Sequence, residues 1–196
     1  LPHSYTYRKV YKSNKFGMYM PQFQMPVEEC GNMILLSYAY YRVSDDLEFL
    51  KENAATLKKW ADYLIMKGVV LDNQLCTDDF AGHWAGNCNL AIKAIMGIAG
   101  YAEIAKMMGK DDVYEKYNAK AKEMAAAWEK ETKVKDHYEL AYGAGSKTWS
   151  QKYNMIWDKL WKTNIIPNNA MQTEVKYYLK KQNKYGLPLD VRKDYT

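Results

Sequence analysis

The sequence predicts an all-α fold made of helical hairpins, and three observations support this. Apolar residues recur every three or four positions over most of the chain, which is the period of a helix with one buried face. Segments that carry almost no charge alternate with segments that carry charge along one side. Short links between consecutive segments alternate with long ones. We therefore expect pairs of antiparallel helices joined by short turns.

The first hairpin is expected over residues 26–66. Pro26 marks the way into a helix over residues 29–42, which carries almost no charge between its ends and should be buried on nearly every side. Ser44 is a candidate N-cap for the partner helix, residues 45–66, whose apolar positions follow one face. The first helix should therefore be an inner, buried helix, and the second should pack outside it with its charged face toward solvent.

The same alternation repeats twice further along the chain. Residues 90–108 are mostly apolar and residues 111–132 are amphipathic, and a third pair follows over residues 151–162 and 168–185. Buried helices that alternate with amphipathic ones are typical of the inner and outer rings of an α/α toroid, which closes with about six hairpins. We expect about three of the six here, with the others in the same polypeptide or in another copy of the chain.

The bulk composition bounds the class of protein. A chain of 196 residues with 48% hydrophobic and 26% charged residues can form one domain with a real core. The net charge of +5 is spread over helix faces, so we expect no nucleic-acid partner, and no apolar run is long enough to be a transmembrane segment.

Residues 1–24 read as an irregular segment and residues 25–196 as the helical domain. Three cysteines indicate no disulfide framework, although Cys76 and Cys88 are near enough in sequence to meet.

The long links indicate where a site should lie. Residues 68–86 and 133–150 precede the second and third buried helices, and a long irregular segment precedes the first. In an up-and-down arrangement all these links fall at one end of the bundle, beside the N-termini of the buried helices. Helix N-termini favour negative charge, so we expect the site at this end.

Four acids are candidate catalytic residues at that end: Glu28 and Glu29 at the start of the first buried helix, and Asp78 and Asp79 in the loop before the second. Two carboxylates in different environments can serve as general acid and base on a water molecule. The alternative is that they complement helix dipoles or brace the loop. Asp78 and Asp79 are adjacent, so we expect one to brace the loop and the other to face the cavity. Thr77 is a candidate cap for a short turn there.

Polar and aromatic side chains near the same helix starts are candidates for substrate binding. The amides and the ring nitrogens can hold a polar substrate, or they can be ordinary caps and braces. The spacing of the loop acids and the loop histidine matches no standard zinc or calcium pattern, so we expect no metal and no cofactor. The candidates are Asn32, His83, Trp84, Asn87 and Asn89.

Five stretches of the chain resemble the central helical domain of the glutaminase A family of bacteria and fungi. The resemblance spans residues 25–196, whereas PHS at residues 2–4 departs from the PHD expected there. It implies a six-hairpin toroid like that of many glycoside hydrolases, usually in a larger secreted or surface-exported protein with β-rich domains. The matching stretches are MPVEECGNM (25–33), WADYL (60–64), NQLCTDDFAGH (73–83), NLAIKAI (89–95) and KQNKYGLPLDVRKDYT (181–196).

The resemblance implies hydrolysis of L-glutamine to L-glutamate and ammonia, with carboxylate-assisted attack of water on a small-molecule substrate. It also implies a secreted, periplasmic or cell-surface location. Two alternatives stay open. The first is a glycoside hydrolase, in which two acids flank a glycosidic bond, and the second is a non-catalytic helical module. With half of the ring absent from this chain, we expect the chain alone to be inactive.

Overall fold

The computed structural model describes residues 24–69, 71 and 73–192, and within them the regular elements are helices, which confirms the predicted all-α fold. Three hairpins follow one another along the chain, joined by two long links. The helices are α2 (Pro26–Ser44), α3 (Leu47–Lys67), α4 (Cys88–Met107), α5 (Asp111–Thr132), α6 (Ile156–Trp161) and α7 (Asn168–Leu179), with 3-10 turns η3 (Asp79–Ala81) and η4 (Tyr153–Met155).

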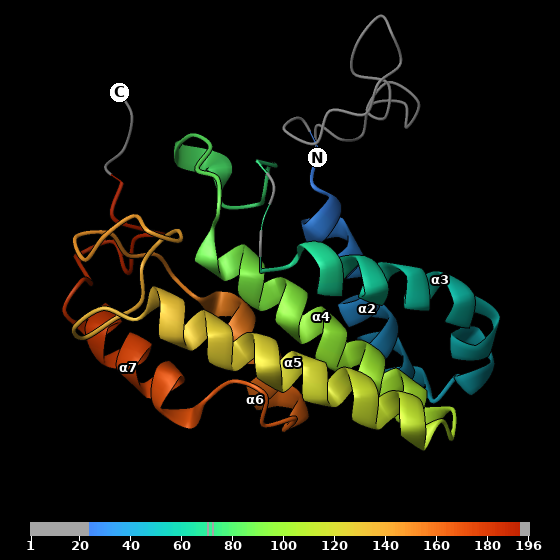
Figure 1. The fold of residues 1–196 in the computed structure, drawn as a ribbon. Helices are drawn as coiled ribbons and strands as arrows, with labels where there is room; N and C mark the ends of the chain where they lie inside the picture. Colours follow the sequence, from blue (N-terminus) through green and yellow to red (C-terminus); the bar gives the residue numbers. More distant parts are fainter. Residues whose placement is uncertain (1–23, 70, 72, 193–196) are drawn as a thin grey trace, which may run out of the picture.

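Helix α4 is the centre of the domain. It packs against α2, α3, α5 and η4, and Figure 1 shows it crossing the molecule between α2 and α5. Every residue from Cys88 to Ala102 is buried, as the apolar run predicts. Among the described helices, α4 alone is long and apolar enough to cross a membrane, and 94% of that stretch is buried inside the protein.

Helix α2 departs from the prediction that it is buried on nearly every side. Met33, Leu36, Tyr40 and Val43 are between 43% and 91% exposed. Their spacing places them on one side of the helix, which we call the α2 stripe. The burial expected from the uncharged sequence is wrong for this face because no described element packs on it. The opposite face is buried against α3 and α4.

Two glycines allow α2 and α4 to approach closely. A Cβ added at Gly97 of α4 would lie 2.7 Å from Leu64 Cδ1 and 3.3 Å from the Cα of Gly31 in α2. A Cβ added at Gly31 would lie 2.7 Å from Lys93 Cγ. The small residues therefore bring the N-terminal half of α2 onto the middle of α4, and this contact places the acids at the start of α2.

The first turn between helices differs in detail from the prediction. The cap of α3 is Asp46, whose carboxylate accepts a hydrogen bond from the Phe49 backbone N–H at 3.0 Å, so the assignment of Ser44 is wrong. Ser44 instead ends α2 and donates its hydroxyl proton to the Tyr40 carbonyl. The reason is that Asp45 adopts a left-handed conformation with φ 58°, which ends α2 and delays the next helix.

The third hairpin is shorter than predicted. The α6 region begins as a 3-10 turn and becomes helical only at Ile156, and α7 ends at Leu179 rather than near residue 185. A turn closed by reciprocal backbone hydrogen bonds between Asn183 and Gly186 replaces the expected last turns of helix. The chain then returns beside residues 149–151, at the long-loop end of the domain.

Substitution at the glycine contact tests this packing. We expect Gly97→Ala to destabilise the protein by about 1–3 kcal/mol, because the added methyl group overlaps Leu64. Gly100→Ala is the matched control, since its Cβ would meet no atom nearer than 3.4 Å and gains up to about 1 kcal/mol of helix propensity. Chemical denaturation measures both. Equal effects of the two substitutions would contradict the close approach of α2 and α4.

Candidate functional site

The long links and the N-termini of the buried helices meet at one end of the domain, as Figure 1 shows for the links before α4 and η4. The backbone N–H of Thr77 donates to Glu28 Oε2 at 3.4 Å, which joins the loop before α4 to the start of α2. The backbone N–H of Asn154 donates to Asn89 Oδ1 at 3.2 Å, which joins η4 to the start of α4. The predicted acids of the two segments therefore lie at the same pole.

Glu28 is buried and held by a lysine that the sequence analysis did not single out. Lys93 Nζ, on α4, donates to Glu28 Oε1 at 2.5 Å and to Asn32 Oδ1 at 2.7 Å. Both side chains of the ion pair are almost fully buried. The sequence could have indicated this partner, because a single lysine within an apolar helix that is buried requires a buried anion beside it.

Asp78 is buried and accepts three hydrogen bonds. Its Oδ1 accepts from the Tyr153 hydroxyl at 2.7 Å, and its Oδ2 accepts from Asn89 Nδ2 at 3.0 Å and from Asn87 Nδ2 at 3.4 Å. Burial raises the pKa of Asp78, and the hydrogen bonds from Tyr153 and Asn89 oppose that shift. Tyr153 is a second residue that sequence reasoning missed.

Asn87 and Asn89 organise the start of α4. Asn87 Oδ1 accepts from the backbone N–H groups of Asn89 and Leu90 at 2.8 and 3.0 Å, so Asn87 is the N-cap of the helix. Both Nδ2 groups donate to Asp78. These two amides are thus engaged by the protein, which matches their alternative interpretation as caps and braces.

Asp79 braces the turn. Its Oδ2 accepts from the Cys76 backbone N–H at 3.0 Å and lies 3.1 Å from His83 Nδ1. The other ring nitrogen of His83 lies 2.5 Å from Asn73 Oδ1, so both of its nitrogens have oxygen partners. Asp79 begins the 3-10 turn η3, and Asp78 directly before it is directed to α4 and η4. Thr77 does not cap this turn, since Asp78 occupies the N-cap position and makes no side-chain cap bond.

Glu29 differs from the other three acids. No hydrogen bond or ion pair joins its side chain to another described residue, and burial together with the neighbouring Glu28 charge raises its pKa. It lies four residues before Met33, at the N-terminal end of the α2 stripe. Among the described residues, Glu29 is therefore the acid at this end whose carboxyl group has no hydrogen-bond partner and whose pKa is raised.

The remaining predictions concern Trp84, a metal site and the cysteines. Trp84 is 38% exposed on the loop between α3 and α4 that carries Asp78 and Asp79, which we call the acid loop. Within the described residues no group of three or more His, Cys, Asp or Glu side chains could hold a metal ion. Cys76 and Cys88 are free thiols rather than a disulfide, and Cys76 Sγ lies 3.6 Å from Asp79 Oδ1.

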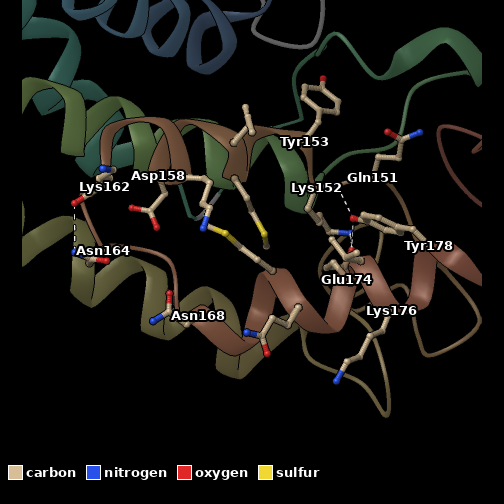
Figure 2. Close-up of a pocket in the computed structure, with 16 residues that line it drawn as sticks. Gln151, Lys152, Tyr153, Asp158, Lys162, Asn164, Asn168, Glu174, Lys176 and Tyr178 are labelled. Carbon is tan, nitrogen blue, oxygen red and sulfur yellow. Dashed lines mark hydrogen bonds and ion pairs between the residues drawn. The ribbon is translucent and has the colours of Figure 1, made fainter.

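A separate cavity of about 1010 Å³ lies between α7 and the η4–α6 segment. Figure 2 shows Asp158, Asn168 and Glu174 among the residues around it. Tyr153 lines this cavity and also donates to Asp78, but none of the four predicted catalytic acids lines it. Apolar side chains of α6 and α7 that border the cavity are exposed, so it marks an open edge of the hairpin array.

These features define a helical-hairpin domain with an acidic, hydrogen-bonded site at the N-terminal end of its buried helices. The chain belongs to the family described as the glutaminase A six helical-hairpin domain, which matches residues 7–196.

Two relatives extend the comparison. The chain is 36% identical to glutaminase A of Aspergillus oryzae (strain ATCC 42149 / RIB 40) over 177 residues, which cover 88% of this chain and 26% of that protein. It is 32% identical over 169 residues to a protein of Arthroderma benhamiae (strain ATCC MYA-4681 / CBS 112371) named Probable glutaminase, covering 71% of this chain and 19% of that protein. The chain thus spans about a quarter or less of the length of these relatives.

The buried ion pair provides a direct test of how the site is held. We expect Lys93→Met to destabilise the protein by about 3–5 kcal/mol, because it leaves the Glu28 carboxylate buried without a counter-charge. The double variant Glu28→Gln/Lys93→Met removes both charges and should recover much of that loss. Urea denaturation measures each free energy of unfolding. A double variant as unstable as Lys93→Met would show that the charge pairing is unimportant.

Proposed function

We propose that this chain is the part of a glutaminase that carries the acids for hydrolysis of L-glutamine to L-glutamate and ammonia. Family membership and the names of the two relatives support the reaction class. One observation carries the assignment of roles: Glu28 is neutralised by Lys93, whereas its neighbour Glu29 has no hydrogen-bond partner among the described residues and a raised pKa. Such a difference between adjacent carboxyl groups is typical of an acid or base poised for proton transfer.

In this proposal Glu29 acts as the proton-transfer group. Its carboxylate takes a proton from water as the water oxygen attacks the side-chain amide carbon of glutamine. The proton then passes to the amide nitrogen, the carbon–nitrogen bond breaks, and glutamate and ammonia leave. A raised pKa brings the group nearer to the pH at which it can both accept and return a proton. The carboxylate of the substrate would lie near the N-termini of α2 and α4, which favour anions.

The site also requires the rest of a ring. We propose that further hairpins, from the same polypeptide or another copy, cover the α2 stripe and the edge between α6 and α7. The family has six hairpins, and three lie within the described residues. Exposed apolar side chains at both edges support this, among them Leu36 on α2 and Ile156 and Val175 beside the cavity. A secreted, periplasmic or cell-surface location is likewise a proposal, based on the resemblance alone.

A glycoside hydrolase is the second candidate, and one observation favours it. Phe80, Trp84 and Tyr153 lie on or beside the acid loop and are 82%, 38% and 37% exposed. Exposed aromatic rings beside two carboxyl groups suit stacking on a sugar. Ammonia release from glutamine and reducing-sugar release from oligosaccharides separate the two reactions. If the complete protein catalyses neither, the non-catalytic helical module is the remaining interpretation.

Replacement of the Glu29 carboxyl group tests the proposed reaction. We expect Glu29→Gln to lower ammonia release by about 100-fold or more, the usual contribution of a general acid or base. Glu48→Gln is the matched control, a first-turn glutamate of α3 that is exposed and should have no effect. Coupled detection of ammonia in the complete protein measures both. Full activity in Glu29→Gln would refute the assigned role.

The same variant has a predicted pH dependence of stability. A raised pKa means that ionisation of Glu29 disfavours the folded state, and this cost grows as pH rises from the ordinary glutamate pKa through the raised value. A glutamine side chain at this position cannot ionise, so Glu29→Gln should melt at the same or a slightly higher temperature at neutral pH. Melting curves at acidic and neutral pH check this. A lower melting temperature at neutral pH would assign Glu29 a structural role.

Ring closure is tested on the α2 stripe. In the complete protein we expect Leu36→Lys to destabilise by more than about 1 kcal/mol, because a covering helix would bury the charge. Met66→Lys, on the outer helix α3 where Met66 is 64% exposed, is the control and should change stability by less than about 0.5 kcal/mol. Equal, small effects would mean that the stripe faces solvent and that no hairpin packs there.

A further inference from the structure

The last described residue is an arginine that reaches back to the acid loop. Arg192 Nη2 donates to the Asp78 carbonyl oxygen at 2.9 Å, and Arg192 Nη1 donates to the Gly82 carbonyl oxygen at 2.5 Å. Asp78 and Gly82 are the residues immediately before and after η3. One guanidinium group therefore binds both ends of the turn that carries the two loop aspartates.

Arg192 is itself held on the third hairpin region. Its Nε and Nη2 donate to Asp190 Oδ2 at 2.9 and 2.5 Å, and its backbone N–H donates to Asp190 Oδ1 at 2.7 Å. The backbone N–H of Val191 donates to the Trp149 carbonyl, and that of Gln151 donates to the Leu189 carbonyl. Residues 187–192, which we call the C-terminal arm, thus run beside the segment that leads directly into η4.

The C-terminal arm and η4 both contact Asp78. The Tyr153 hydroxyl of η4 donates to the Asp78 carboxylate, while Arg192 binds the Asp78 carbonyl from the neighbouring arm. The Tyr153–Asp78 contact depends on the position of the turn, and Arg192 binds the carbonyl groups at both ends of that turn. Lysine cannot replace this function, because its single ammonium centre lacks the planar fork that reaches two carbonyls and one carboxylate together.

We propose that Arg192 is a positioning residue for the site. It fixes the turn over residues 76–82, and the turn, through the hydrogen bond from the Thr77 backbone to Glu28, borders the start of α2 where Glu29 lies. The proposal rests on the proposed function of that site. It also assigns a role to the C-terminal stretch KQNKYGLPLDVRK, which contains no candidate catalytic residue. In this proposal Arg192 acts on the reaction through the turn, whose two ends it binds.

The experiment compares Arg192→Lys and Arg192→Ala with Arg42→Lys and Arg42→Ala in the complete protein. Arg42 is the matched control, an arginine at the far end of α2 that contacts Tyr38. We expect both Arg192 variants to lower kcat for glutamine hydrolysis by about 10- to 100-fold, the effect of misplacing a catalytic constellation by about an ångström. KM should change less than kcat, and added guanidinium ion at millimolar concentration should restore part of the activity of Arg192→Ala only.

Amide hydrogen exchange gives a second readout that does not depend on activity. Exchange at the Cys76 and Gly82 amides should quicken in both Arg192 variants, while α4 and α5 stay protected. Unchanged exchange in the turn, or an unchanged kcat in an active protein, would overturn the proposal. Faster exchange throughout α4 and α5 would also overturn it, by showing that Arg192 serves overall stability. If the wild-type protein releases no ammonia, the proposed function fails. The positioning role of Arg192 is then tested by hydrogen exchange alone: faster exchange in the turn only would support it, and unchanged exchange would refute it.

Discussion

The buried charge of Lys93 is the constraint on which the rest of this structure depends. An ammonium group on the central, apolar helix loses its hydration and must find an anion and further acceptors within the protein. Glu28 and Asn32 on α2 supply them, so the first turn of α2 must lie against α4. This contact pairs Glu28 with Lys93, whereas the neighbouring Glu29 carboxyl group has no partner among the described residues, and this is the difference between the two acids.

The second buried carboxylate is stabilised in another way. Within the part of the chain that the structure describes, no cation pairs with the Asp78 side chain, which instead accepts hydrogen bonds from Tyr153, Asn87 and Asn89. Neutral donors stabilise a buried anion less completely than an ion pair does, and burial accordingly raises the Asp78 pKa. The same end of the domain therefore contains one acid paired with a lysine, Glu28, and two acids that accept hydrogen bonds, Asp78 and Asp79. The fourth acid, Glu29, has no side-chain partner among the described residues.

Local patterns in the sequence predicted the hairpins, the burial of α4 and the end of the bundle where polar side chains meet. They did not reveal Lys93, Tyr153 and Arg192 as partners, because these contacts join residues 65, 75 and 114 positions apart. Local reasoning also placed the α3 cap at Ser44, since the left-handed Asp45 is invisible to helix periodicity. An uncharged run predicts that α2 is covered, but it cannot say which segment covers it.

The most direct measurement is an experimental structure of the complete protein with L-glutamate, the product of the proposed reaction, bound at saturating concentration. We predict product density at the N-terminal end of α2 and α4, with the side-chain carboxylate of the product within hydrogen-bond distance of Glu29 and Lys93 still paired with Glu28. Product bound only in the cavity between α6 and α7, or a Glu29 side chain buried under another hairpin away from the product, would contradict this prediction.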